Sequence, residues 1–157
     1  MEKVFLERFY VVLLVVHLLV TIVLVGSMTH NFLVVVDYLR GKFNRKKLEL
    51  KFLKVSVWSY TFVYIVGALI YPAFRIRVRH EYFDEQLPWA TGLFEVKEHW
   101  AAVGMALIVA IYFFRKSFNP AEDKQKLFLY VPLCFIINIS LWYIVIVSCF
   151  LTILKGS

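Results

Sequence analysis

The chain has 157 residues, of which 61% are hydrophobic, and its mean hydropathy is +0.72. A single domain of this composition is too apolar to be a water-soluble monomer. The formal charge is +7, but the basic residues flank apolar stretches instead of forming a separate soluble face, so nucleic-acid binding has no support beyond charge.

Four apolar stretches follow one another along the chain, and none contains Asp, Glu, Lys or Arg. They cover residues 9–36, 55–74, 100–114 and 127–154. A helix needs about 20 residues to cross a hydrocarbon layer of about 30 Å, which the third stretch alone does not provide. We expect its helix to begin earlier, near Thr91 and Gly92. The sequence therefore predicts an all-α integral membrane protein, a single membrane domain over residues 1–157, in which a four-helix bundle spans at 9–36, 55–74, 92–115 and 127–154.

The connections between these spans differ in charge. Residues 37–54 and 115–126 are rich in Lys and Arg, whereas residues 75–99 mix basic residues with several acids. Cytoplasmic loops carry the excess of Lys and Arg, so both termini and the 75–94 loop are expected on the outer side. We expect the membrane to be a bacterial inner (cytoplasmic) membrane. The basic connections would also favour anionic lipid headgroups.

Two histidines are expected at similar depth from the outer end of the bundle. His17 lies about 12 Å along the first span, and His99 lies about 10 Å along the third if that helix begins near Gly92. Two imidazoles that face each other across a bundle provide the axial ligands of a b-type haem. The alternative is that His17 is hydrogen-bonded to a neighbouring helix and that His99 is an ordinary interfacial residue. Small residues that would make room for the porphyrin are Gly26, Ala101, Ala102 and Gly104.

Three arginines begin the loop that follows the second span, namely Arg75, Arg77 and Arg79. Guanidinium groups recognise carboxylates well, so haem propionates that emerge at this surface would be natural partners. The alternative is that these arginines are interfacial and form ion pairs with lipid phosphates and nearby acids. Those acids are Glu81, Asp84 and Glu85.

Other polar residues occur within or beside the spans. Lys97, at the entry to the third span, lies between two glutamates and is expected to be ion-paired, to extend its ammonium group to the membrane surface, or to hold an acidic substrate group. Tyr60 and Tyr64 in the second span and Asn138 in the fourth are expected to make hydrogen bonds inside the bundle.

Several short motifs resemble, in order and spacing, a four-helix membrane superfamily. It includes the HemJ type of protoporphyrinogen oxidase and the CopD-like copper-resistance domain. The resemblance implies that His17 contacts a b-type haem and that Lys97 is a functional partner at the same site. The stretches that carry it are His17-Leu18-Leu19, Val25-Gly26-Ser27, Lys46-Lys47-Leu48, Gly67-Ala68-Leu69, Lys97 and Tyr130-Val131-Pro132-Leu133.

Three functions remain open from the sequence. The first is a haem-b-binding membrane subunit for electron transfer, with His17 and His99 as iron ligands and the three arginines over the propionates. The second is a HemJ-like oxidation of protoporphyrinogen IX, with Lys97 as the catalytic residue. The third is a cofactor-free structural subunit that docks onto a larger membrane complex through its 75–94 loop. The expected partners are the lipid bilayer and either other membrane or redox subunits or further copies of the chain.

Overall fold

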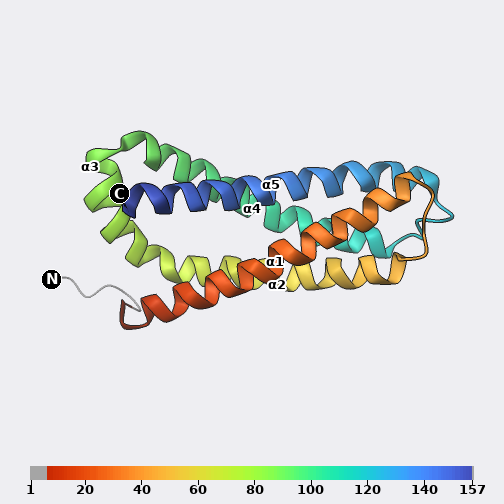
Figure 1. Cartoon of the computed structure of the whole chain (residues 1–157), viewed down its shortest axis with the longest axis horizontal. Helices are drawn as coiled ribbons and strands as arrows, with labels where there is room; N and C mark the ends of the chain where they lie inside the picture. Colours follow the sequence, from red (N-terminus) through yellow and green to blue (C-terminus); the bar gives the residue numbers. More distant parts are fainter. Residues whose placement is uncertain (1–6, 157) are drawn as a thin grey trace.

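The computed structural model describes residues 7–156, and within that range the chain is helical apart from short turns and contains no strand. Residues 1–6 and 157 of the expected membrane domain lie outside the described part. Figure 1 shows that the long helices form an elongated bundle. The elements are the 3-10 helix η1 (Glu7–Phe9), α1 (Tyr10–Leu39), α2 (Lys46–Phe74), the π-helix η2 (Arg75–Phe83), α3 (Asp84–Gln86), α4 (Pro88–Lys116) and α5 (Lys124–Gly156).

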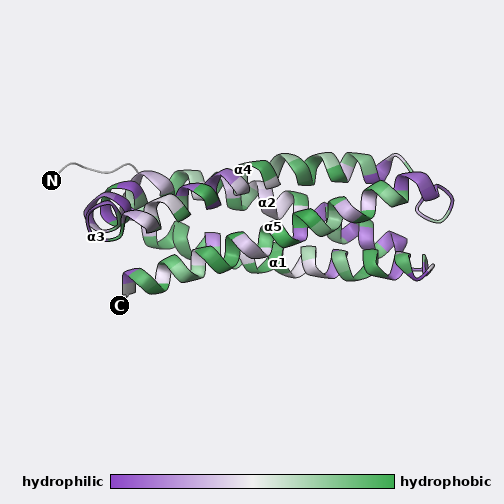
Figure 2. Ribbon diagram, turned by 90° about the horizontal axis from the view of Figure 1, so that it is seen from above, coloured by the Kyte–Doolittle hydropathy of each residue, from purple (hydrophilic) through white to green (hydrophobic). Residues whose placement is uncertain are grey.

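The prediction of four long apolar helices is confirmed. The segments that are long and apolar enough to cross a membrane are Tyr10–Leu39, Lys46–Gln86, Pro88–Lys116 and Lys124–Lys155. Large apolar side chains cover the outside of the bundle, for example Val11, Leu18 and Ile22 on α1. Figure 2 shows that hydrophobic residues dominate the length of the helices, while hydrophilic residues gather at the two ends. This outward-facing apolar surface suits a hydrocarbon environment and indicates an integral membrane protein.

The helices are arranged so that α1 and α4 occupy diagonal corners. The helix α1 packs mainly on α2 and α5, and α4 packs on the same two helices. The core between them contains Leu24, Val35, Ile108 and Ile137. One end of the bundle holds the two short turns at residues 40–45 and 117–123, and we call it the turn end.

The other end differs from the expectation, because the segment 75–94 is helical and not an open loop. The helix α2 continues directly into η2 and α3, and only Leu87 separates α3 from α4. Pro72 has no N–H to donate to the carbonyl four residues earlier, and the backbone changes to π-helical bonding shortly after it. Figure 1 shows the chain curving over the end of the bundle here. We call residues 75–94 the cap and this end the cap end.

The cap has a small hydrophobic core of its own. Val78, Phe83, Ala90 and Phe94 pack with residues from the last part of α5. The Phe74 and Phe94 rings stack with their centroids 4.5 Å apart. The Tyr82 hydroxyl donates to the carbonyl of Leu154 on α5 at 3.0 Å. These contacts fix the cap against the bundle.

The start of α4 also differs from the expectation. The helix begins at Pro88, a residue whose missing N–H suits the first helical position, and not near Thr91 and Gly92. Thr91 instead donates its hydroxyl to the Asp84 carboxylate at 2.6 Å and so ties α4 to α3. The helix α1 begins and α5 ends at the cap end, as expected for four spans (Figure 1). The side of the membrane that this end faces stays a prediction.

Candidate functional site

His17 lies in the α1–α2 interface, where it packs over one turn of α2. A Cβ atom built on Gly67 would come within 3.3 Å of the His17 Cε1 atom, so the ring packs closely on this glycine and would have to shift by a few tenths of an ångström for a larger residue. The Nδ1 atom of His17 is buried and has no hydrogen-bond partner among the described residues. Lys97 and Glu98 are near enough to act on the ring electrostatically. His17 is therefore an enclosed imidazole with one unused nitrogen.

His99 does not meet His17 in this arrangement. It is exposed on α4, the helix diagonal to α1, and its Nδ1 atom is 2.7 Å from the carbonyl oxygen of Glu95 in its own helix. Within residues 7–156 no contact joins the two imidazoles. That the two histidines hold a haem between them stays a prediction.

The space expected for the porphyrin is used by a side chain. The Tyr60 hydroxyl lies against Gly104, inside the volume that a Cβ atom would need, and it donates to the carbonyl of Ala101 at 3.2 Å. The small residues at this level of α4 thus make room for a tyrosine from α2. By contrast, a Cβ atom built on Gly26 would have no neighbouring atom within 4 Å.

The three arginines of the cap do not share one environment. Arg79 pairs with two acids, since its Nη2 atom lies 2.6 Å from the Glu95 carboxylate and its Nε atom 3.8 Å from Asp84. Arg75 and Arg77 are exposed on the surface of η2. Arg79 therefore matches the alternative in which the arginines pair with nearby acids.

Lys97 is ion-paired, which is one of the three expected alternatives. Its ammonium group lies 2.7 Å from Glu98 and 4.6 Å from the centre of the Phe94 ring, and its side chain is only 13% exposed. The expected interior hydrogen bonds are confirmed for Tyr60 and for Asn138, which donates to the Met28 carbonyl at 3.0 Å. The expectation for Tyr64 is wrong, because this side chain is exposed.

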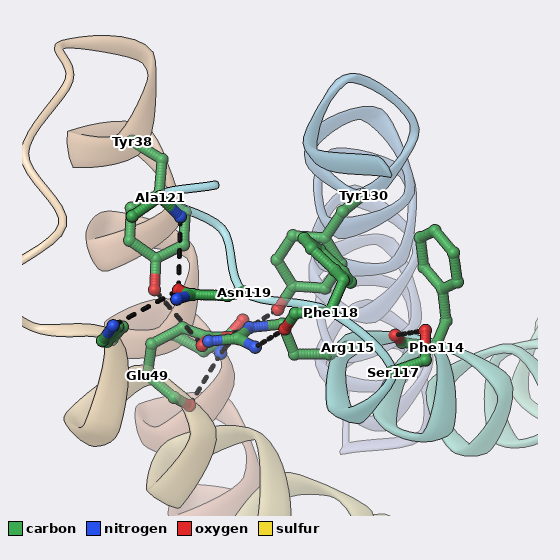
Figure 3. Close-up of polar contacts among 11 residues, drawn as sticks. Tyr38, Glu49, Phe114, Arg115, Ser117, Phe118, Asn119, Ala121 and Tyr130 are labelled. Carbon is green, nitrogen blue, oxygen red and sulfur yellow. Dashed lines mark hydrogen bonds and ion pairs between the residues drawn. The ribbon is translucent and has the colours of Figure 1, made fainter. Parts of the chain in front are cut away.

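The most enclosed charged group lies at the turn end and was not singled out from the sequence. Glu49, in the first turn of α2, has a fully buried side chain, and Arg115 near the end of α4 is 6% exposed. The Arg115 Nε atom donates to Glu49 Oε2 at 2.7 Å. Figure 3 shows these groups meeting between the helices. We call Glu49, Arg115 and the three residues described next the clasp.

The Glu49 residue also receives bonds from the other two helices. Tyr38 on α1 donates to Oε2 at 3.3 Å, and Tyr130 on α5 donates to Oε1 (Figure 3). Asn31 on α1 donates to the Glu49 backbone carbonyl at 3.1 Å. One residue thus links all four long helices, and both carboxylate oxygens are occupied. A buried charge is tolerated only when it is paired and hydrogen-bonded in this way.

Arg115 is satisfied as well. Its Nη1 atom donates to the carbonyl of Phe118 at 3.1 Å, and the guanidinium lies 5.5 Å from the Phe118 ring centre. One helical turn from Asn31, the hydroxyl groups of Ser27 and Ser56 lie 2.9 Å apart and join α1 to α2. Asn31, Ser27, Ser56 and the charged groups of the clasp therefore connect helices to one another.

A sequence signal for the clasp exists in the spacing of the second helix. Glu49, Leu53, Ser56 and Tyr60 recur at helical intervals and are all buried, so they share one face of α2. Stretches without charged residues do not reveal this face, because Lys51 and Lys54 lie between its residues in the sequence. Their long side chains are exposed, as expected for lysines near the end of a span.

Comparison with known proteins adds no family to this geometry. No family model, no curated protein and no solved structure matches the chain.

Proposed function

We propose that the protein is a structural subunit of a membrane complex, in which the bundle acts as a rigid scaffold and the cap contacts a partner. The observation that carries this proposal is the clasp, because a single buried carboxylate on α2 is bonded from the three other long helices. Polar groups arranged in this way specify one helix arrangement instead of facing a substrate.

The cap supports the second half of the proposal. A continuous helical path from Lys46 to Gln86 has 41 residues, about twice the number needed to cross a bilayer. The path is held at the cap end by its own core and by the Arg79 ion pairs. A fixed and charged surface at the end of a span is suited to contact another protein.

Site-specific crosslinking in native membranes tests this function. A photo-crosslinking residue at exposed Glu85 in the cap is compared with one at exposed Lys42 at the turn end. We expect a discrete crosslinked partner from position 85 and none from position 42. Particles of single-chain size after gentle extraction, with no crosslink at position 85, would refute the proposal.

A second candidate function is binding of a b-type haem, and one observation favours it. The enclosed His17 ring has an unused nitrogen, as a metal ligand does before its metal is bound. His17 would hold the iron, and nearby Lys97 would have to exchange its pairing with Glu98 for a carboxylate of the group. Bound haem would supply one-electron chemistry in the membrane. The reduced-minus-oxidised absorption spectrum of the purified protein, with His17→Ala as comparison, decides whether b-type bands are present and depend on His17.

The orientation is also part of the proposal. We place the turn end in the cytoplasm and the cap outside, in a bacterial inner membrane, because Lys and Arg are concentrated around residues 37–54 and 115–126. Labelling of single cysteines introduced at positions 42 and 85 by a membrane-impermeant maleimide in intact cells tests this placement. We expect only position 85 to react.

A further inference from the structure

A pocket of about 220 Å³ opens at the turn end, between the start of α2 and the turn that follows α4. It is independent of His17 and of the cap. Its lining is half basic or amide-bearing and half apolar. The residues are Lys46, Lys47, Leu50, Arg115, Phe118, Asn119 and Pro120.

The positive charge of this pocket comes from two lysines. Arg115 also reaches the pocket, but its charge is already balanced by the buried Glu49. Lys46 donates to the neutral side chain of Asn119 at 3.3 Å, and Lys47 is exposed. Among the described residues neither lysine forms an ion pair with an acid.

The amide of Asn119 is held in place by the turn. Its Nδ2 atom donates to the Glu122 carboxylate, which leaves Oδ1 directed to the Lys46 ammonium group. Figure 3 shows Asn119 beside the clasp, with dashed lines to its neighbours. The polar half of the pocket is therefore built on a constrained turn and on the first turn of α2.

The position of the pocket decides which anion suits it. The lysines lie at the end of two helices that are apolar enough to cross a membrane, at the level where lipid headgroups begin. Leu50, Phe118 and Pro120 line the same pocket and offer apolar contact beside the charges. A ligand with a phosphate next to hydrocarbon matches both halves.

We propose that this pocket binds the headgroup of an anionic phospholipid. Lys46 and Lys47 contact the phosphate, and Leu50 and Phe118 contact the adjoining part of the acyl chains. Each lysine near an anionic headgroup is worth roughly a fivefold change in binding, so the pair contributes roughly 30-fold.

The full-length protein in detergent, titrated with phosphatidylglycerol and with phosphatidylcholine, tests this proposal by native mass spectrometry. We expect phosphatidylglycerol to be retained preferentially, and the preference to fall roughly 30-fold in Lys46→Gln/Lys47→Gln. The matched control is Lys42→Gln/Lys116→Gln, which removes the same charge from exposed residues outside the pocket and should keep the preference. Equal retention by the pocket variant and the unmodified protein would overturn the proposal.

A replacement variant and a competition titration complete the test. If the double variant fails to fold, Lys47→Glu replaces it, because this exposed side chain supports no contact within the described bundle, and the same loss is expected. Soluble glycerol phosphate is titrated as a competitor. Displacement of phosphatidylglycerol by glycerol phosphate at equal concentration would show a site for soluble phosphates and would overturn the lipid assignment.

Discussion

Arg115 on α4 and Glu49 on α2 form an ion pair of 2.7 Å that is closed off from the surroundings. Breaking a buried pair by removing one partner costs about 3–5 kcal/mol, because the remaining charge is left uncompensated. Removing both charges costs less, since no isolated charge remains. The pair therefore couples two parts of the chain that are far apart in sequence.

The first prediction concerns this coupling. Glu49→Gln and Arg115→Gln should each lower stability by about 3–5 kcal/mol, and the double variant should be more stable than the sum of the two losses implies. Thermal or denaturant unfolding in one detergent measures the cycle. Lys116→Gln, at the exposed neighbouring position, should change little. Simple additivity in the double variant would show that the two charges do not depend on each other.

The second prediction concerns the close approach of α2 and α4. Gly104→Ala should cost about 1–3 kcal/mol, because the new methyl group needs the space of the Tyr60 hydroxyl. The same substitution in a Tyr60→Phe background should cost less. Gly26→Ala is the control, since nothing lies within 4 Å of the added atom and alanine favours a helix by about 1 kcal/mol over glycine. Unfolding midpoints compare each variant with its parent, which is Tyr60→Phe for the double variant, and equal losses at positions 104 and 26 would contradict the packing.

The third prediction separates the two candidate functions at His17. An unpartnered buried polar atom costs about 1–3 kcal/mol, so His17→Leu should keep or raise stability if the residue is only part of the scaffold. The crosslink from position 85 should then persist. If His17 holds haem, the variant instead loses b-type absorption and the stability that comes with the bound group. Stability and the absorption spectrum, measured on the same preparations, distinguish these outcomes.

The fourth prediction is a pH dependence at the start of α5. The Asp123 carboxylate accepts a hydrogen bond from the backbone N–H of Lys126 at 3.0 Å. The ammonium group of Lys126 lies 3.1 Å from the same carboxylate. These contacts lower the pKa of Asp123, with the backbone hydrogen bond as the largest cause. A lowered folded-state pKa means that the contribution to stability is present above the unfolded value of about 3.9 and is lost as the pH falls through the folded value.

Comparison with Asp123→Asn makes this dependence visible. The asparagine can still cap the helix but does not titrate. We expect the unmodified protein to be the more stable of the two at pH 6 and the difference to shrink as the pH falls below 4. Unfolding midpoints over this range measure it. A difference that stays constant with pH would contradict the role assigned to the carboxylate.

The number and order of the long helices could be predicted from the sequence, because uninterrupted apolar stretches have few other solutions in a membrane. The ends of the helices could not. Lysines at positions 51 and 54 placed the predicted start of the second span at residue 55, which is too late, because their side chains reach outward from a helix that begins at Lys46. The cap was expected as a loop because its composition is charged, whereas it is helical and has a small core around Phe83.

The candidate site was harder to predict than the fold. Depth along a helix placed His17 and His99 at similar levels, but depth does not give the direction of a side chain around the helix axis. His99 faces outward, and Glu49 faces inward although it stands in a strongly basic segment. The partner that Glu49 needs comes from α4, and pairing between distant helices depends on a packing arrangement that single-sequence patterns do not contain.

The clasp also has a consequence for how the protein is made. Glu49 precedes its ionic partner Arg115 by 66 residues and Tyr130 by 81. During synthesis the acid therefore leaves the ribosome well before the groups that neutralise and cover it. A hairpin of the first two helices alone would bond this carboxylate through Tyr38 but would leave it without its cation at the rim of the bilayer. It must therefore stay in contact with water or an insertion factor until α4 and α5 arrive. Biogenesis of this small protein is consequently expected to be all-or-none, with truncated chains cleared and not accumulated as partly inserted forms.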